Sequence, residues 1–225
     1  MFQGYTDKTV EFMWSIRFNN ERGWFMEHKE MYQKELLEPT KALAEQVYEG
    51  LREKLPNEPL MMKVSRIYRD ARRLFGRGPY KDHLWFCVRT GDEDWTGRPT
   101  FYFEIAPEYY SYGMGCYDPT PVTMAKLRAR IHRDPAPLEE LARRLDQQEE
   151  FVLEGQEYKR PKGDPGPLLY PWYNRKQIGL SSDHNCEAEF FSPELADQIM
   201  NGFRFLVPYY CYLRDLAGDP PPEIN

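Results

Sequence analysis

The sequence predicts an α+β fold, a single domain in which a central, mainly antiparallel sheet is flanked by N-terminal and C-terminal helices. Apolar residues recur every three or four positions near both ends of the chain, the period of a helix that buries one face. In the middle, residues 100–106 alternate between apolar and polar side chains, as a half-buried strand does. Hydrophobic residues make up 41% of the chain and aromatic residues 15%, a composition typical of a packed globular protein.

Three helices are expected in the first quarter of the chain. The first runs from about Asp7 to Phe18, and the second from about Glu21 towards Leu37. Pro39 is expected to start or kink the third, and Pro56 and Pro59 end it. The positions that set the register of these helices are Val10, Met13, Trp14 and Phe18; Phe25, His28, Tyr32 and Leu36; and Leu43, Val47, Leu51 and Leu55.

Strands are expected next, at Leu84–Val88, Thr100–Ala106 and Tyr109–Cys116. A short turn joins the second of these strands to the third, which gives an antiparallel meander. Gly113 and Gly115 lie inside the last strand and predict a bulge, a strand end or a close approach of another backbone.

The starts of three later helices are predicted by a polar residue followed by proline, a pair suited to the N-cap and the first turn of a helix. The pairs are Asp118-Pro119, Asp134-Pro135 and Ser192-Pro193. Pro208 should kink or divide the last of these helices. Between them, residues 155–171 are rich in glycine and proline and predict a loop.

We expect the domain to cover residues 1–217 and the tail at 218–225 to be flexible. No segment is apolar over the roughly 20 residues that a membrane-spanning helix needs, so no membrane partner is expected. The first residues lack the basic start and the apolar run of a secretion signal. These features favour a cytoplasmic protein.

Four cysteines, Cys87, Cys116, Cys186 and Cys211, are far apart and form no CxxC pair. We therefore expect free, mostly buried thiols rather than disulfides. The spacing D-H-x-C at residues 183–186 matches no established zinc pattern, so no metal site is predicted. The sequence also lacks a P-loop, a dinucleotide fingerprint and a nucleophile elbow, and it identifies no cofactor.

Positive charge is concentrated between residues 63 and 81. This stretch, KVSRIYRDARRLFGRGPYK, holds seven basic residues and one acidic residue, whereas the whole chain has a net charge of -6. A local excess of positive charge on an acidic protein attracts anions. The sequence pI of about 5.4 argues against a general nucleic-acid coat protein, but a local basic cleft is compatible with a nucleotide or a short strand.

Arginines and one tyrosine are grouped in the first part of this stretch. If residues 63–70 form a strand, Arg66, Tyr68 and Asp70 point to one side and Arg69 to the other. The arginine side chain offers a planar fork of donors for phosphate or carboxylate, and Arg72 extends the set. Two interpretations stay open: an anion site in which Asp70 holds an arginine in position, or an internal ion-pair network. The unbalanced charge favours the anion site.

Tyr80, Lys81 and His83 follow a proline that stiffens the approach to the next strand. Lys81 would add a point charge for an oxyanion, and His83 would transfer a proton near neutral pH. An ordinary hydrogen-bonding histidine is the more frequent alternative at such a position. Lys162 lies on a second basic loop, which is either solvated or, through its glycine, able to bring backbone amides to an anion.

Several motifs, in a fixed order, resemble those of a bacterial family, the domain of unknown function 2461 family. They are NNERGWF (19–25) with a later proline at Pro39, RIYRDAR (66–72) followed by PYK (79–81), GMGCYDP with a following LRARI (113–131), and KRPKG (159–163). The pair RIYRDAR and PYK is the most specific. The family pattern has an aromatic directly after the last arginine and a lysine in the loop; here we expect Phe75 and Arg77 in those places. The resemblance implies a shared α+β fold and no assigned reaction.

Three functions follow as alternatives. The first is a module that binds an anionic, phosphate-bearing small molecule or a short nucleic acid in a basic and aromatic cleft. The second is an enzyme, a hydrolase or transferase, that uses the same cleft with Asp70 or His83 as the acid or base. The third is a structural or protein-interaction role. The sequence does not predict an oligomeric state.

Overall fold

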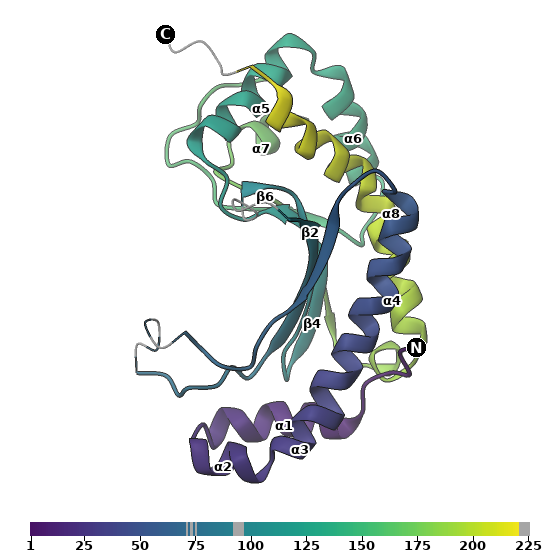
Figure 1. The fold of residues 1–225 in the computed structure, drawn as a ribbon. Coiled ribbons are helices and arrows are strands. Elements are labelled where there is room, and N and C mark those ends of the chain that lie inside the picture. Colours follow the sequence, from purple (N-terminus) through teal and green to yellow (C-terminus); the bar gives the residue numbers. More distant parts are fainter. Residues whose placement is uncertain (71, 73, 75, 92–96, 221–225) are drawn as a thin grey trace. The chain divides into compact units, whose positions relative to one another are not determined.

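The structure is a computed structural model, and it describes residues 1–70, 72, 74, 76–91 and 97–220 (Figure 1). Helices and an antiparallel sheet form an α+β fold, which confirms the predicted class. Within the described residues the sheet has six strands in the order β1-β2-β3-β4-β6-β5. The strands are β1 (Leu60–Val64), β2 (Leu84–Thr90), β3 (Thr100–Ile105), β4 (Tyr109–Cys116), β5 (Val152–Glu154) and β6 (Ile178–Asn185).

The chain divides into two compact units, and each is described in turn. The first comprises residues 1–88, 102–112 and 183–201, and the second comprises residues 89–101, 113–182 and 202–225.

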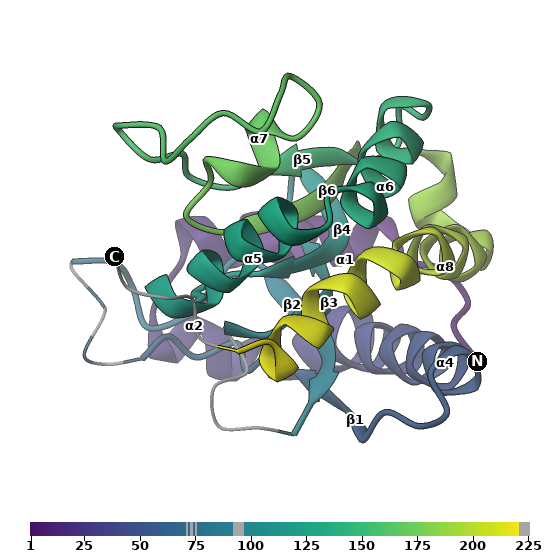
Figure 2. The same cartoon turned by 90° about the horizontal axis from the view of Figure 1, so that it is seen from above.

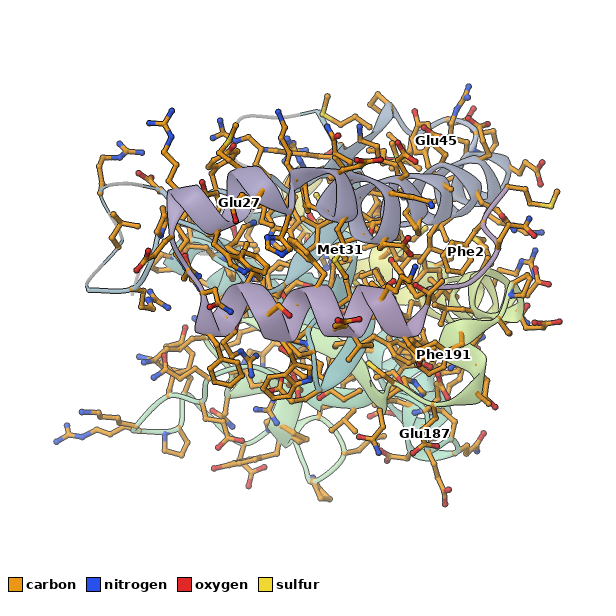
Figure 3. The ribbon with its side chains drawn as sticks, turned by 90° about the horizontal axis from the view of Figure 1, so that it is seen from below. Phe2, Glu27, Met31, Glu45, Glu187 and Phe191 are labelled. Carbon is orange, nitrogen blue, oxygen red and sulfur yellow. The ribbon has the colours of Figure 1, made fainter. Side chains whose placement is uncertain are left out.

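The N-terminal helices of the first unit follow the predicted boundaries closely. Helix α1 covers Asp7–Phe18, as expected. The expected second helix consists of α2 (Arg22–Glu27), α3 (Lys29–Met31) and a π-helix, η1 (Tyr32–Leu37). Figure 3 shows α1 beside the run of helices that carries Glu27 and Met31, and α1 packs against η1.

Helix α4 (Glu38–Lys54) begins with Pro39 in its first turn, and this proline explains the π-helix before it. Proline has no N–H, so the carbonyl of Glu35 lacks the donor that an α-helix would supply. The hydroxyl of Thr9, on α1, donates to that carbonyl at 2.6 Å instead. The Glu38 N–H donates to the carbonyl of Gln33, five residues back, which is the wider turn of a π-helix.

Replacing the buried Thr9 by valine tests this account. Valine keeps the shape but leaves the Glu35 carbonyl without the donor, so we expect the free energy of unfolding to fall by about 1–3 kcal/mol. Thr9→Ser keeps the hydroxyl and should lose less. Chemical denaturation of both variants measures the difference, and a Thr9→Val protein as stable as wild type would mean that the hydrogen bond does not stabilise this site.

The strands of the first unit pack their buried side around aromatic rings. Phe86 of β2 and Phe103 of β3 stack with ring centroids 5.3 Å apart, and Tyr5 stacks on Phe190 at 4.8 Å. All four rings are fully buried. In β3 the alternate residues are only half-buried, which confirms the alternation predicted for this strand.

The second unit contains α5 (Pro121–Arg133), α6 (Ala136–Asp146), α7 (Tyr170–Tyr173) and the later part of α8 (Glu194–Arg214), all labelled in Figure 2. Helix α5 packs against α7 and against the short helix η5 (Asp215–Gly218).

The polar-proline pairs mark the helix starts with one error. Asp134 Oδ1 accepts from the Ala136 N–H at 3.3 Å, and Ser192 Oγ accepts from the Glu194 N–H at 3.2 Å, as expected. The start predicted at residues 118–119 is wrong, because α5 begins two residues later. Thr120 caps it by accepting from the Thr123 N–H at 3.1 Å, and the next residue is again a proline.

Further differences concern the end of the chain and the short strands. Helix α8 is one helix that contains Pro208, so this proline does not divide it. Strands β5 and β6 were not predicted; they pair with each other through Val152–Ser181, Leu153–Leu180 and Glu154–Gly179. In the predicted tail, Asp219 accepts from Arg130 Nε at 2.6 Å, and residues 221–225 lie outside the described residues.

The glycines of β4 lie against the backbone of β6, which confirms the predicted close approach. A Cβ on Gly113 would lie 2.0 Å from the carbonyl oxygen of Leu180, and one on Gly115 would lie 2.8 Å from that of Ile178. The four cysteines, all of them among the described residues, are thiols outside any disulfide, also as predicted. In the part of the chain that the structure covers, no helix combines the length and the apolar character needed to span a membrane.

Candidate functional site

The first unit brings together three segments that are far apart in the sequence: residues 20–25, 66–70 and 79–81. The Arg69 N–H donates to the Pro79 carbonyl at 2.8 Å, and the Lys81 N–H donates to the Ile67 carbonyl at 2.7 Å. Tyr68 and Tyr80 thus form an isolated antiparallel bridge. Of residues 63–70, which the sequence was expected to place in a strand, only residues 63 and 64 belong to β1, and residue 68 forms the isolated bridge. Side-chain burial still alternates, with residues 66, 68 and 70 exposed and residue 67 buried.

Asn20 joins the first of these segments to the last. Its side-chain NH2 donates to the Tyr80 carbonyl at 2.9 Å, and its Oδ1 accepts from the Tyr80 N–H at 2.9 Å. One side chain thereby satisfies both backbone groups of Tyr80. Gly78 makes room for it, because a Cβ there would lie 2.2 Å from Asn20 Oδ1.

These two hydrogen bonds form an Asn20 clamp on Tyr80, and three aromatic rings pack together next to it. Phe25 stacks on Tyr80 with centroids 4.2 Å apart and meets Tyr68 edge-on at 5.9 Å. Tyr80 is only 3% exposed, whereas Tyr68 is 53% exposed. Tyr80 is therefore a core residue, and Tyr68 is the ring of this group that a ligand can reach.

A cleft of about 410 Å³ opens beside these rings. Its apolar side chains are Phe25, Tyr32, Leu37, Val64 and Ile67, and its polar ones are Lys29, Lys41, Ser65, Arg66 and Tyr68. The three cations come from three segments, and all are exposed at the rim. Among the described residues none of these three cations forms an ion pair, and no acidic side chain lines the cleft.

Tyr32 and Leu37, the first and last residues of the π-helix, both line the cleft. Burial raises the pKa of Tyr32 to about 12, and nearby Tyr68 acts in the same direction. Its hydroxyl therefore stays protonated at neutral pH. Because π-helical turns occur frequently at functional sites, the wide turn in this wall is consistent with a binding role.

Arg69 does not face the cleft, because it belongs to an ion-pair network. Its Nε donates to the Tyr80 carbonyl at 2.8 Å, and its Nη2 lies 3.6 Å from Asp82 Oδ1. Arg17 bonds both Asp82 and Glu108. Burial alone would raise the pKa of Asp82, but hydrogen bonds from Arg17 and His83 outweigh it and hold that pKa below its usual value. For Arg69 the internal network is the interpretation that fits.

The two candidate acid–base residues are each engaged with a neighbour. Arg72, at 88% side-chain exposure, donates from Nη2 to Asp70 Oδ2 at 2.7 Å. His83 Nδ1 lies 3.2 Å from Asp82 Oδ1. Arg73 of the basic stretch and Phe75, the expected substitute for the family aromatic, lie outside the described residues.

Lys162 lies in the second unit. Its backbone N–H donates to Asn174 Oδ1 at 2.6 Å, and its Nζ lies 4.9 Å from the centre of the Tyr158 ring. Asn174 also donates to the Gly163 carbonyl at 3.0 Å, so one buried amide holds this loop in place.

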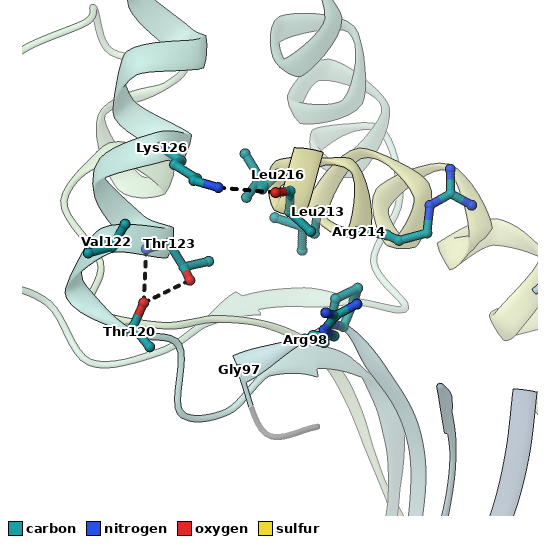
Figure 4. A pocket seen from close by; sticks show the side chains of 11 residues that line it. Gly97, Arg98, Thr120, Val122, Thr123, Lys126, Leu213, Arg214 and Leu216 are labelled. Carbon is teal, nitrogen blue, oxygen red and sulfur yellow. Dashed lines mark hydrogen bonds between the residues drawn. The ribbon is translucent and has the colours of Figure 1, made fainter. Parts of the chain in front are cut away.

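A second cavity, of about 270 Å³, lies within the second unit and is also lined by cations (Figure 4). Lys126 and Arg214 each bond another group of the protein. Lys126 Nζ donates to the Ala217 carbonyl at 3.1 Å, and Arg214 Nε donates to Asp215 Oδ1 at 2.8 Å. The hydroxyl of Thr120 caps helix α5. This cavity is therefore a weaker candidate than the cleft of the first unit.

Sequence reasoning found Arg66 and Tyr68 but missed Lys29 and Lys41. Lys29 follows Phe25 by four residues, which places the two on one helical face, so a signal was present. Across the described ranges, no group of three or more His, Cys, Asp or Glu side chains is placed to hold a metal ion.

Comparison with known proteins gives one family. The family model described as conserved hypothetical protein (DUF2461) matches residues 8–212. No curated protein matches the chain. The matched range contains the Asn20 clamp, the arginine segment and the cleft. The chain therefore belongs to the domain of unknown function 2461 family.

Proposed function

We propose that the protein binds a small anion, a phosphate or carboxylate attached to an apolar or aromatic group, in the cleft of the first unit. The observation that carries the proposal is the set of three cations, Lys29, Lys41 and Arg66, around one cavity without a carboxylate. The chain as a whole has a net charge of -6, so three grouped cations without a carboxylate produce a local positive potential that a bound anion would neutralise.

The side chains that line the cleft suggest which part of the ligand contacts the rim and which part contacts the floor. Arg66 offers a planar fork that suits phosphate or carboxylate oxygens, and the two lysines add point charges. Buried Phe25 and Ile67 form an apolar floor, and the exposed ring of Tyr68 offers a surface on which an aromatic group can stack. A ligand with a charged end and a flat apolar end satisfies both parts.

Thermal unfolding with a panel of ligands tests the proposal. The panel contains nucleoside monophosphates, sugar phosphates, aromatic carboxylates, inorganic phosphate and short oligonucleotides. A ligand at ~100 times its Kd should stabilise the protein by about 2.7 kcal/mol. For a protein of this size that is a rise in Tm of roughly 5–10 °C. Absence of any shift across the panel would contradict the proposal.

Arg66→Ala should weaken binding of the ligand found in this panel by roughly 10- to 150-fold, because a charge-assisted contact is worth roughly 1.5–3 kcal/mol. The matched control is Arg72→Ala, since Arg72 is exposed and pairs with Asp70. Isothermal titration calorimetry measures both. Equal affinities in wild type and Arg66→Ala would remove Arg66 from the site.

A further inference from the structure

Two residues that carry a hydroxyl group, Tyr32 and Ser65, line the cleft of the first unit together with its apolar and cationic side chains. Both are buried, with 7% and 5% of their surface exposed. Tyr32 is the first residue of the π-helix, and Ser65 follows the last residue of β1. Two segments that are far apart in the sequence thus each bring a buried hydroxyl group to one cavity.

Each of these hydroxyl oxygens accepts a hydrogen bond from the backbone. The Trp85 N–H donates to Ser65 Oγ at 3.1 Å. The Ile67 N–H donates to the Tyr32 oxygen, which partly offsets the rise in the Tyr32 pKa that burial causes. Among the described residues, neither hydroxyl donates its own hydrogen to a protein group. A hydroxyl has one donor besides its acceptor lone pairs, and a buried donor without a partner indicates a bound water or ligand.

The positions of the charges decide which part of a ligand meets these two donors. The cations Lys29, Lys41 and Arg66 are exposed at the rim, whereas Tyr32 and Ser65 are buried. When the cations hold the anionic end of a ligand at the rim, its uncharged end lies against the buried part of the lining. The uncharged end is therefore the part that can accept hydrogen bonds from the two hydroxyls.

We propose that the cleft selects a ligand whose uncharged end is a heteroaromatic ring with carbonyl or ring-nitrogen acceptors, and that Tyr32 and Ser65 recognise these acceptors. This inference rests on the proposed function and narrows its ligand from any apolar or aromatic group to this class. A hydrocarbon ring would cover both hydroxyls without accepting from them, so both donors would lose water and gain no bond. A site that forms hydrogen bonds with its ligand discriminates strongly against an analogue that lacks the matching groups.

Calorimetry on the wild-type protein with two carboxylates of similar size tests the proposal. Uracil-1-acetate has two ring carbonyl groups, whereas phenylacetate has the same charge and a hydrocarbon ring. We expect uracil-1-acetate to bind roughly 10- to 100-fold more tightly, the effect of two net hydrogen bonds. Pyridyl phosphate and phenyl phosphate form the matching pair for a phosphate ligand, and the pyridyl compound should bind more tightly.

The outcomes separate this inference from the proposed function. Equal affinities within both pairs, or tighter binding of the hydrocarbon rings, would overturn the inference and leave the proposed function intact, because the cations would still hold the anion. Binding of none of the four compounds would overturn both.

Tyr32→Phe and Ser65→Ala each remove one donor and test the assignment to these residues. Each variant should bind uracil-1-acetate roughly 3- to 10-fold more weakly and phenylacetate no more weakly than wild type, so the preference between the two compounds falls. Tyr48→Phe is the matched control, because the Tyr48 hydroxyl donates to the Leu60 carbonyl at 2.9 Å and Tyr48 does not line the cleft. It should keep the wild-type preference. A wild-type preference in both Tyr32→Phe and Ser65→Ala would remove the two hydroxyls from the site, and the wild-type comparison decides the ligand class without any variant.

Discussion

Gly113→Ala should lower the free energy of unfolding by about 3 kcal/mol or more. A Cβ at this position would lie 2.0 Å from the Leu180 carbonyl oxygen and 3.0 Å from its carbon. Both contacts are to backbone atoms of β6, and β6 is held on its other side by β5. The new methyl group cannot be accommodated by a side-chain rotation, so a strand has to move.

Gly23→Ala is the matched control for this substitution. Gly23 lies within α2, and nothing approaches the position of its Cβ within 4 Å. Alanine is the better helix former, so this variant should gain roughly 0.4–1 kcal/mol. Denaturant unfolding of both variants gives the comparison. A Gly113→Ala protein as stable as wild type would mean that β4 and β6 are farther apart than the structure places them.

The helices were predictable from the sequence because their signals are local. Apolar residues at helical spacing defined α1, and polar-proline pairs marked the later helices. Strand β6 has no comparable signal: its sequence IGLSSDHN is polar over its second half, and its neighbours in the sheet determine its place. The π-helix likewise depends on Thr9, which lies 26 residues before the carbonyl that it satisfies.

The candidate site was predictable only in part for the same reason. Charge density selected the stretch that contains Arg66, but it could not separate Arg66 from Arg69. That separation depends on the Arg69 partner Asp82 and on the exposure of alternate residues. Lys41 joins the cleft because α4 follows the wide turn of the π-helix, an arrangement that spacing along the chain does not reveal.

The positions of the family motifs explain why the family match defines the fold better than the ligand. Asn20, Arg69 and Tyr80 all belong to the motifs, and the side chains of Asn20 and Arg69 both form hydrogen bonds with the Tyr80 backbone. These residues fix the course of the chain. Of the three cations at the cleft, only Arg66 lies within a motif quoted from the sequence. The ligand can therefore differ among members of the family that share the hydrogen bonds to the Tyr80 backbone.

Asn20→Ala should lower the free energy of unfolding by about 1–3 kcal/mol, because it leaves the Tyr80 N–H without its acceptor and removes one of the two donors to the Tyr80 carbonyl, which keeps its bond from Arg69 Nε. Asn19→Ala is a control of the same residue type one position away. The Asn19 side chain is exposed and donates only to the Ser15 carbonyl at the end of α1, so its loss should change stability by roughly 0.5 kcal/mol or less.

Asn20→Asp distinguishes the two bonds of the clamp. Aspartate still accepts from the Tyr80 N–H but cannot donate to the Tyr80 carbonyl, so its stability should fall between wild type and Asn20→Ala. Because Tyr80 supports Phe25 and Tyr68, the alanine variant should also weaken ligand binding in the cleft. Chemical denaturation and calorimetry measure the two effects. If Asn20→Ala and Asn19→Ala were equally stable, the Asn20 clamp would not stabilise the segment at residues 79–81, and other contacts would have to hold the rings of the cleft in place.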